Sequence, residues 1–176
     1  MFLLVTGGSG SGKSAYAEQE TVKLGGSPRI YLATMMSFDE ESRKRIARHR
    51  RMRADKDFET IECYTGIRHV HVPHGSTVLL ECMSNLTANE MFSPEGAGEH
   101  TVREILDGIR HLKEQAAHLI VVTNEIFSDG IAYDSETMRY QEYLGRINRE
   151  LGKLADRVTE VVYGIPLIQK KEGMTQ

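Results

Sequence analysis

The feature that most constrains the fold is a glycine-rich segment near the N-terminus. Directly after a short apolar run, Phe2–Thr6, the sequence reads Gly7-Gly8-Ser9-Gly10-Ser11-Gly12-Lys13-Ser14. This spacing fits the phosphate-binding loop G-x-x-x-x-G-K-[ST], which joins a strand to a helix. Glycines let successive backbone N–H groups turn into one concavity, and the helix N-terminus behind them favours a polyphosphate. The alternative, a turn with no chemical role, requires a chance match between a strand and a helix. We therefore predict that this loop binds a nucleotide.

Short apolar runs alternate with helical patterns along the rest of the chain. The helical patterns cover about residues 13–24, 102–117 and 135–154, and in the last of them Met138 and Leu144 fall on the apolar side. The other apolar runs lack strict alternation, as expected for strands covered on both faces: Arg29–Ala33, Thr77–Glu81, Leu119–Thr123 and Val158–Tyr163. Strands that alternate with helices pair in parallel through right-handed crossovers. The prediction is an α/β fold, with a P-loop NTPase-like, mostly parallel central sheet flanked by helices.

The composition excludes several classes of protein. The 176 residues include 22 Lys and Arg against 25 Asp and Glu, a net charge of −3, which does not suit a general nucleic-acid binder. No apolar run reaches the ~20 residues of a membrane span, and no basic segment of a signal peptide precedes the glycines. Cys63 and Cys82 are the only cysteines, which excludes a disulfide framework and a cysteine-based zinc site. We expect a single cytoplasmic domain over residues 1–170 and a frayed tail over residues 171–176.

Four side chains near the predicted loop are candidates for handling phosphate and metal. Lys13 would reach the β- and γ-phosphates, and the Ser14 hydroxyl would ligate Mg²⁺. Ligands of open parallel sheets bind at the carboxyl ends of the strands, where Glu81 closes one apolar run and Glu125 follows another. Glu81 is the better candidate for orienting Mg²⁺ or its water shell, with a surface glutamate at a strand end as the alternative. Glu125 could contact Mg²⁺, the substrate or the backbone of a loop.

A strongly basic segment interrupts this near-neutral chain. Residues 43–56 contain eight basic side chains and one acid, a charge of +7, so the rest of the chain carries −10. Ser37 and Glu40 have the spacing of a capping box, which predicts a helix that begins near residue 38. The helix has few apolar residues, so it must lie on the surface or over a ligand. His49 stands among its arginines, which could bind phosphates through paired hydrogen bonds. From these residues alone, a solvated basic helix remains the alternative.

A second group of histidines, His69, His71 and His74, has a spacing that suggests a metal site. No cysteine or carboxylate joins them, and the valines between them favour an edge strand instead. We therefore do not expect a metal there.

Taken together, the motifs resemble those of the bifunctional adenosylcobinamide kinase / adenosylcobinamide-phosphate guanylyltransferases of cobalamin biosynthesis. The resemblance covers nearly the whole chain in order. Besides the glycine-rich loop, it includes these motifs: Ala17-Glu18, Tyr31-x-Ala33-Thr34, Arg45-Ile46-x-x-His49-Arg50-x-x-Arg53, Thr60-x-Glu62, Leu79-Leu80-Glu81-Cys82 with Asn89, Val122-Thr123-Asn124-Glu125, Gly145-x-x-Asn148 and Gly164-Ile165-Pro166-Leu167. The sequence departs from the family pattern at residues 127–132, which lack a proline and a glycine, and at Gln141, which replaces an arginine.

This resemblance implies that His49 is the nucleophile that takes GMP from GTP, with Lys13 as the second catalytic residue. It also implies a homotrimer that uses Mg²⁺ and takes GTP and ATP as co-substrates, with adenosylcobinamide as the other substrate. No nucleic acid or membrane partner is expected. The residues implied to contact the nucleotide, besides the glycine-rich loop Gly7–Ser14, are Ala33, Thr34, Met35, Arg50, Arg51, Met52, Arg53, Glu62 and Glu81.

Three hypotheses follow from this pattern. The first is an enzyme that phosphorylates adenosylcobinamide and then transfers GMP to the phosphate through His49. The second is a kinase for a small alcohol without guanylyl transfer, in which phosphoryl transfer would survive the loss of His49. The third is a nucleotide-sensing module that binds GTP without turnover. The motifs around His49 favour the first hypothesis.

Overall fold

The computed structural model describes residues 1–37, 39–127, 130–131 and 133–171. In this part of the chain, a seven-stranded sheet has the order β3-β2-β4-β5-β1-β6-β7. All neighbouring strands pair in parallel except β6 and β7. The strands are β1 (Phe2–Thr6), β2 (Arg29–Ala33), β3 (Phe58–Glu62), β4 (Thr77–Glu81), β5 (His118–Val122), β6 (Arg157–Val162) and β7 (Ile165–Lys171). The helices are α1 (Lys13–Leu24), α2 (Glu40–Arg53), α3 (Met83–Phe92), α4 (Thr101–Gln115) and α5 (Ser135–Leu154), with short 3₁₀ turns η1 (Ile67–His69) and η2 (Gly98–His100).

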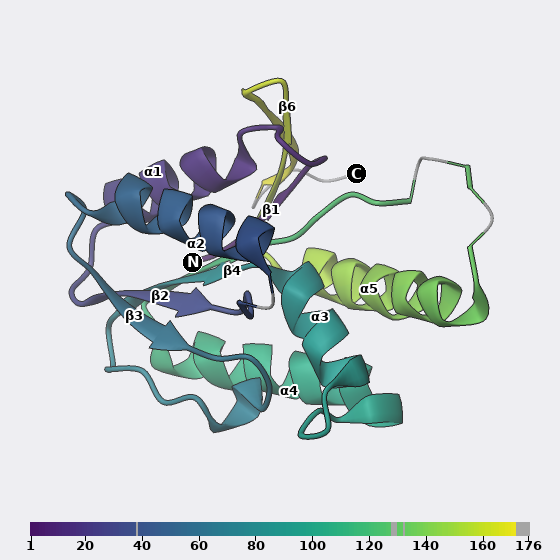
Figure 1. The fold of residues 1–176 in the computed structure, drawn as a ribbon. Coiled ribbons are helices and arrows are strands. Elements are labelled where there is room, and N and C mark those ends of the chain that lie inside the picture. Colours follow the sequence, from purple (N-terminus) through teal and green to yellow (C-terminus); the bar gives the residue numbers. More distant parts are fainter. Residues whose placement is uncertain (38, 128–129, 132, 172–176) are drawn as a thin grey trace.

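The sheet separates two helical layers. Helices α1 and α2 lie on one side of it, and α3, α4 and α5 lie on the other (Figure 1). Strand β1 is buried on both faces, because Leu3 and Val5 pack in the cluster with α1 while Phe2 and Leu4 pack in the cluster with α4 and α5. Burial on both faces accounts for apolar runs without alternation. The predicted α/β fold with a mostly parallel sheet is confirmed.

The central elements agree closely with the sequence prediction. Strands β1, β2 and β4 have the predicted bounds, and β5 and β6 each begin one residue before the predicted run. Helices α1 and α5 also match, but Met138 of α5 is 59% exposed, so its placement on the apolar face was wrong. Among the described residues, no helix combines the length and hydropathy needed to span a bilayer.

Three elements were not predicted from the sequence. Strand β3 lies at the sheet edge beside β2 and is largely exposed, and α3 is a ten-residue helix without a side-chain cap at its N-terminus. Strand β7 runs to Lys171, one residue beyond the predicted domain boundary, and residues 172–176 lie outside the described residues. The edge strand predicted around His69 and His71 was wrong, because the 3₁₀ turn η1 and irregular backbone occupy this segment.

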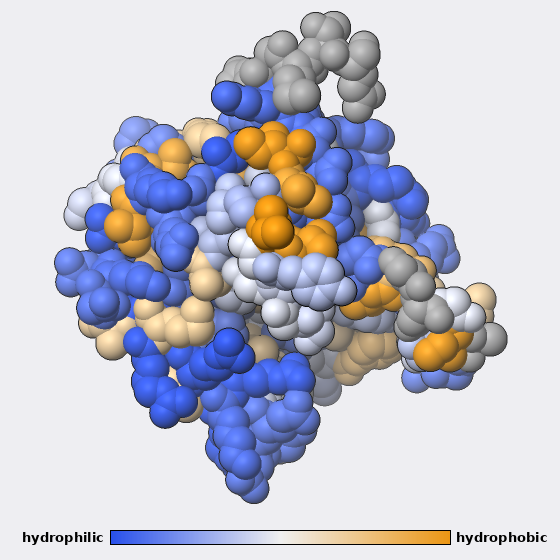
Figure 2. All heavy atoms as spheres, turned by 90° about the horizontal axis from the view of Figure 1, so that it is seen from above, coloured by the Kyte–Doolittle hydropathy of each residue, from blue (hydrophilic) through white to orange (hydrophobic). Residues whose placement is uncertain are grey.

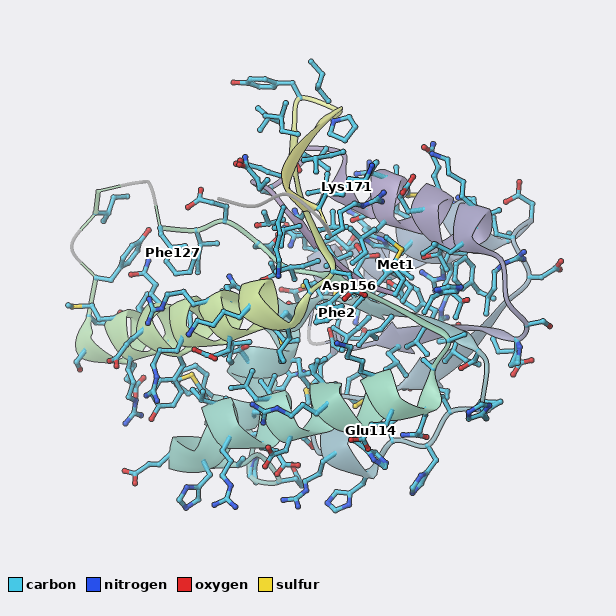
Figure 3. All side chains as sticks on the ribbon, turned by 180° about the vertical axis from the view of Figure 1, so that it is seen from behind. Met1, Phe2, Glu114, Phe127, Asp156 and Lys171 are labelled. Atoms are coloured by element: carbon cyan, nitrogen blue, oxygen red, sulfur yellow. The ribbon has the colours of Figure 1, made fainter. Side chains whose placement is uncertain are left out.

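The β6–β7 hairpin projects beyond the body of the molecule (Figure 1). Its base is fixed where the backbone N–H of Phe2 donates to Asp156 at 2.6 Å, and these two residues lie together in Figure 3. Strand β7 exposes Ile165, Leu167 and Ile168, at 61%, 44% and 51%. Apolar atoms gather on the face of the molecule from which the hairpin projects (Figure 2). This apolar surface is unusual for a strand at the edge of a sheet, where charged residues normally discourage pairing with other chains.

Candidate functional site

The glycine-rich loop follows β1 and leads into α1, as predicted. Gly10 and Gly12 have φ values of +71° and +91°, a left-handed conformation that a side chain would strain. At Gly7 a Cβ would lie 2.5 Å from the carbonyl oxygen of Val161, so the backbone of β6 leaves no room for one. The loop is tied down by the backbone N–H of Gly164, which donates to the carbonyl of Ser11 at 2.8 Å. These contacts hold an open loop at the N-terminus of α1, where backbone N–H groups can receive phosphate.

Lys13 and Ser14 begin α1 and face the end of β4. The Lys13 ammonium donates to the carbonyl of Gly8 at 2.9 Å, so it bends back over its own loop. Burial lowers the pKa of Lys13, and the nearby Cys82 and Glu81 partly offset this. The Ser14 hydroxyl donates to the carboxylate of Glu81. The hydroxyl and carboxylate are hard oxygen donors, the type that Mg²⁺ prefers, so this pair fits the ligand set expected for a nucleotide-bound Mg²⁺.

Helix α2 starts from a different cap than the one predicted. Its N-cap is Asp39, whose side chain accepts the backbone N–H of Ser42 at 2.7 Å, while the Ser42 hydroxyl accepts the backbone N–H of Asp39 at 3.0 Å. The backbone N–H and then the hydroxyl of Ser42 lower the pKa of Asp39. The predicted Ser37–Glu40 capping box was therefore wrong, because the helix begins later and Glu40 is its first residue. Glu40 instead pairs with Lys44, one turn further on, at 2.8 Å.

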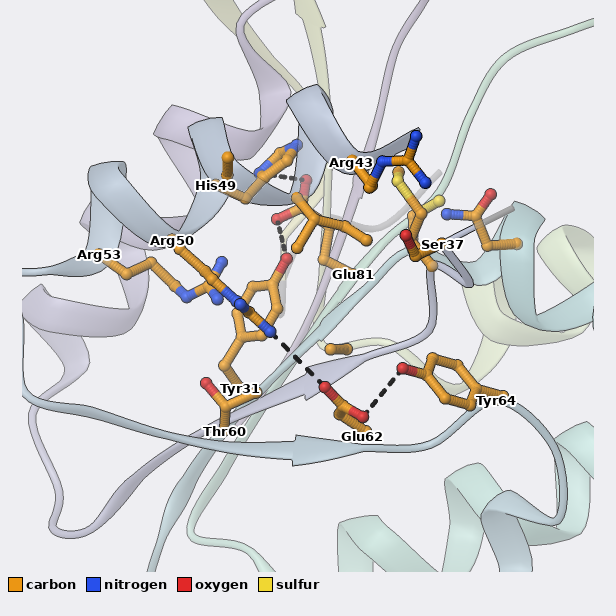
Figure 4. A pocket seen from close by; sticks show the side chains of 16 residues that line it. Tyr31, Ser37, Arg43, His49, Arg50, Arg53, Thr60, Glu62, Tyr64 and Glu81 are labelled. Atoms are coloured by element: carbon orange, nitrogen blue, oxygen red, sulfur yellow. Dashed lines mark hydrogen bonds and ion pairs between the residues drawn. The ribbon is translucent and has the colours of Figure 1, made fainter. Parts of the chain in front are cut away.

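Helix α2 forms the roof of a pocket of about 440 Å³ (Figure 4). The floor comes from the carboxyl ends of β2, β3 and β4, where ligands of parallel sheets bind. Arg43, His49 and Arg50 of α2 line the pocket, and only Arg53 of this helix is buried. Most of α2 is exposed to solvent, as the alternative of a solvated basic helix expects, but one of its faces lines this pocket. The other lining residues are Tyr31, Ala33, Met35, Ser37, Ile46, Ala47, Arg53, Thr60, Glu62, Tyr64, Glu81, Cys82 and Asn85.

Two contacts attach the basic face of α2 to the sheet. The Arg53 guanidinium lies 3.3 Å above the centre of the Tyr31 ring, and both side chains are buried. Arg50 reaches Glu62 of β3 at 3.7 Å, and Tyr64 donates its hydroxyl to the same carboxylate at 2.9 Å. Burial raises the pKa of Tyr31, so its ring stays neutral beneath the guanidinium. These arginines therefore stay at the pocket with a positive charge facing its interior.

His49 extends from α2 toward the Glu81 carboxylate at the end of β4 (Figure 4). Its Nδ1 lies 3.7 Å from Glu81 Oε1, which is too far for a hydrogen bond. The imidazole is 20% exposed, so it is partly screened from solvent but open to the pocket. Because the same Oε1 atom of Glu81 accepts from Ser14, one carboxylate oxygen lies between His49 and the end of the glycine-rich loop.

Among the described residues, one group of side chains has the arrangement of a metal site. A nitrogen of His49 and carboxylate oxygens of Glu18 and Glu81 all lie within 4.8 Å of one another. However, Glu18 is fully buried and paired with the Lys56 ammonium at 2.6 Å. A metal ion in this position would lie beside that ammonium, so the Ser14–Glu81 pair is the more suitable place for a cation.

Several predicted site residues have other surroundings. Thr34 is buried, and its hydroxyl bridges to the backbone of Cys82, accepting its N–H at 2.7 Å and donating to its carbonyl at 2.9 Å. Arg51 and Met52 lie on α2 but are not among the pocket-lining residues. Glu125 contacts loop backbone, one of its three predicted options, because its carboxylate accepts the N–H of Phe127 at 2.8 Å.

The structure also adds site residues that the sequence reasoning missed. Tyr31 and Asn85 line the pocket, although Tyr31 had been noted only as part of a motif. The signal for Arg43, Ile46 and Ala47 was present in the sequence, because their spacing puts them on the same helical face as Arg50. Gln141, which departs from the family pattern, donates to the carbonyl of Ile126 at 3.4 Å. Of the departing segment 127–132, residues 128, 129 and 132 lie outside the described residues.

A family model for cobinamide kinase / cobinamide phosphate guanyltransferase (CobU) matches residues 3–168. The chain belongs to this family. It is 33% identical to the bifunctional adenosylcobalamin biosynthesis protein CobU of Escherichia coli, over 94% of this chain and 97% of that protein. It is 31% identical to the protein of the same name from Salmonella typhimurium, over 94% and 97%, and 27% identical to CobP of Pseudomonas aeruginosa, over 97% and 98%. The predicted family and enzyme class are confirmed.

Solved structures of P-loop NTPases have a similar fold. A KaiC-like protein from Pyrococcus horikoshii aligns with a TM-score of 0.55 and 13% identity, over 99% of this chain and 81% of that one. A solved ATPase domain aligns with a TM-score of 0.51 and 10% identity, over 99% and 78%. At such low identity these likenesses concern the fold alone. Membership of the CobU family makes the chain an enzyme of the cobinamide kinase and cobinamide phosphate guanyltransferase type.

Proposed function

We propose that the protein phosphorylates the aminopropanol hydroxyl of adenosylcobinamide and then transfers GMP from GTP to that phosphate, through a covalent intermediate on His49. The product is adenosylcobinamide-GDP. The observation that carries this proposal is the position of His49, which faces a pocket lined by arginines and lies 3.7 Å from the carboxylate that also contacts Ser14. A nucleophile, phosphate-binding side chains and a phosphate-binding loop thus share one end of the sheet.

For the kinase step, the glycine-rich loop Gly7–Ser14 would hold the triphosphate of ATP or GTP. Lys13, which donates to the carbonyl of Gly8 at 2.9 Å, would turn to the phosphates. Ser14 and Glu81 would hold Mg²⁺, which neutralises charge on the phosphates when bound.

For the guanylyl step, His49 would attack the α-phosphorus of GTP and pyrophosphate would leave. Arg50 and Arg53 line the pocket and would stabilise the charge that develops on the phosphates. Ala33, Met35 and Glu62 line the same pocket and would contact the nucleoside. Three other predicted residues are weaker candidates for contact with the nucleotide. The hydroxyl of Thr34 is hydrogen-bonded to the backbone of Cys82, and Arg51 and Met52 are not among the pocket-lining residues.

We further propose that the protein is cytoplasmic and works as a homotrimer. The apolar surface of β7 supports association, since Ile165, Leu167 and Ile168 are 44–61% exposed. Sedimentation equilibrium distinguishes a trimer from the 19.8 kDa monomer. A mass equal to one chain at micromolar concentration would contradict association.

The guanylyl step is tested by incubating the protein with α-labelled GTP and Mg²⁺. We expect label on the protein that is lost in acid and retained in base, as for a phosphoramidate. The label should be absent from His49→Ala and unchanged in His74→Ala, a matched control at an exposed histidine. Kinase activity without label in the wild type would favour the kinase-only alternative. Tight GTP binding without consumption of adenosylcobinamide would favour a binding module.

A further inference from the structure

Glu18 is a buried acid close to the proposed nucleophile, His49. It lies on α1, one turn after Ser14, and its side chain is fully buried. One carboxylate oxygen, Oε2, accepts from the Lys56 ammonium at 2.6 Å. The other oxygen, Oε1, is buried and has no hydrogen-bond partner among the described residues. Burying a carboxylate oxygen without a hydrogen-bond partner costs free energy, so Oε1 is expected to have a partner when the protein works.

The neighbouring imidazole of His49 also has a buried polar atom that lacks a hydrogen-bond partner among the described residues. This atom is Nδ1. A nitrogen of His49 and a carboxylate oxygen of Glu18 lie within 4.8 Å of each other. Each of these neighbouring side chains therefore has one buried polar atom without a partner among the described residues.

Glu81 is the competing partner for this nitrogen, but its carboxylate is already engaged. Its Oε1 accepts from Ser14, and its Oε2 accepts from the Tyr31 hydroxyl at 3.4 Å. Glu18 has one oxygen unpartnered among the described residues, while its other oxygen accepts from the Lys56 ammonium. Glu18 is therefore the better acceptor for an N–H of His49.

We propose that Glu18 is the positioning residue of His49, accepting the hydrogen bond of Nδ1–H and so leaving the Nε2 lone pair free to attack. This inference rests on the proposed function of His49. In the first step the Nε2–P bond forms, the bond from the α-phosphorus to the bridging oxygen breaks, and pyrophosphate leaves with that electron pair. The positive charge that develops on the imidazole is balanced by the Glu18 carboxylate. In the second step a phosphate oxygen of the acceptor attacks, and the electron pair of the Nε2–P bond returns to Nε2.

The alternative is that Glu18 only tethers α2 to α1 through its ion pair with Lys56. The two roles differ in the substitution Glu18→Gln. The amide oxygen would stay on the Lys56 ammonium, which needs an acceptor, and the amide NH₂ would face Nδ1. Nδ1 would then be the acceptor and Nε2 would carry the proton, which blocks its attack. A tether would survive this substitution with no effect on the choice of nitrogen.

The test measures single-turnover transfer of label from α-labelled GTP to His49. By analogy with the loss seen when a carboxylate that orients a catalytic histidine becomes an amide, Glu18→Gln should slow transfer about 100-fold or more. Its half-saturating GTP concentration should stay within about threefold of the wild type, because only the chemical step is affected. Glu20→Gln is the matched control, since Glu20 is a buried, ion-paired acid on the same helix that contacts Arg157 and Lys23 instead. Equal rates for the two variants would overturn the proposal.

A second measurement determines the tautomer of His49, and its result for the wild type tests the proposal without a variant of Glu18. In protein labelled with ¹⁵N-histidine, two-bond ¹H–¹⁵N correlations distinguish the tautomers of a neutral imidazole, and the signals of His49 are those missing from His49→Ala. We expect Nδ1–H for His49 in the wild type and Nε2–H in Glu18→Gln. Nε2–H in the wild type would overturn the proposal, even if Glu18→Gln fails to fold. If the wild type takes no label from GTP, the proposed function fails, and the tautomer still decides the contact with Glu18.

Discussion

The stacking of Arg53 on Tyr31 sets how firmly the basic helix is held over the pocket. The guanidinium carbon lies 3.3 Å above the ring centre, and the two residues are 7% and 4% exposed. A cation–π pair is worth ~0.5–1 kcal/mol at an exposed site and ~2 kcal/mol when desolvated. Burial places this pair at the upper value. Replacing Arg53 by methionine should therefore remove about 2 kcal/mol of favourable interaction.

A second effect opposes this loss. Arg53 also has a buried nitrogen, one of its two terminal guanidinium nitrogens, with no partner among the described residues. An unsatisfied buried group of this kind costs ~1–3 kcal/mol, and methionine removes the cost. Because the two effects are of similar size, Arg53→Met alone should change the free energy of unfolding by less than about 1 kcal/mol. The stability of the single variant therefore does not report the energy of the Arg53–Tyr31 stack.

A double-mutant cycle with Tyr31→Leu isolates the stacking energy. We expect a coupling of about 2 kcal/mol between the two substitutions, measured by urea unfolding of the four proteins followed by circular dichroism. Equal m-values across the set would show that the surface exposed on unfolding is unchanged. A coupling below ~0.5 kcal/mol would refute the reasoning, because it would mean that the buried stack is worth no more than an exposed one.

Two further predictions concern the scaffold. Gly108→Ala should lower the free energy of unfolding by ~1–3 kcal/mol, because a Cβ there would lie 2.4 Å from Ile67 Cγ2. Gly152→Ala should raise the free energy of unfolding by ~0.5–1 kcal/mol, because this glycine is in a helix and a Cβ there would meet nothing within 4 Å. Thermal unfolding measures both variants, and melting temperatures that shift in the same direction would contradict the packing argument. Burial alone would raise the pKa of Glu20, but hydrogen bonds from two basic side chains outweigh it and lower the pKa below 4.5. The folded protein therefore gains stability from this ionised carboxyl above the unfolded pKa and loses it as the pH falls through the lower folded value. The stability difference between wild type and Glu20→Gln should shrink on acidification below pH 4.5, and a constant difference in acid-denaturation curves would contradict this.

The sequence predicted best where burial on both faces dictated the residue types. Strands β1, β2 and β4 are continuous apolar runs and came out with their observed bounds. Strand β3, Phe58–Glu62, was missed because its edge position leaves most of it exposed, so it carries two glutamates and no apolar run. Strand β7 was missed for a related reason, since it pairs only with β6 and contains Pro166.

The candidate site was predictable in its chemistry but not in its contacts. The glycine spacing indicated Lys13 and Ser14, the end of an apolar run indicated Glu81, and the family motifs indicated His49. No pattern in the sequence indicated that Ser14 donates to Glu81, or that Glu18 lies beside His49. Such contacts depend on how α1 and α2 sit against the end of β4, which is set by packing between segments far apart in the chain.

Helix α2 is attached to the sheet by polar and aromatic contacts and not by apolar packing. Neither of the two apolar core clusters contains a residue of α2, and the helix buries only Arg53. Its attachments are polar or aromatic: the stack on Tyr31, the pair of Arg50 with Glu62, and the Lys56–Glu18 pair just beyond its end. Displacing the helix would break these contacts while exposing little apolar surface. The attachment of α2 therefore depends on polar and aromatic contacts, whereas the stability of the core depends on apolar burial. Apart from the stack of Arg53 on Tyr31, which joins a roof residue to a core residue, substitutions in the core and on the roof of the pocket should therefore act on stability almost independently. Most of the roof can then be altered for a different nucleotide or acceptor without unpacking the sheet.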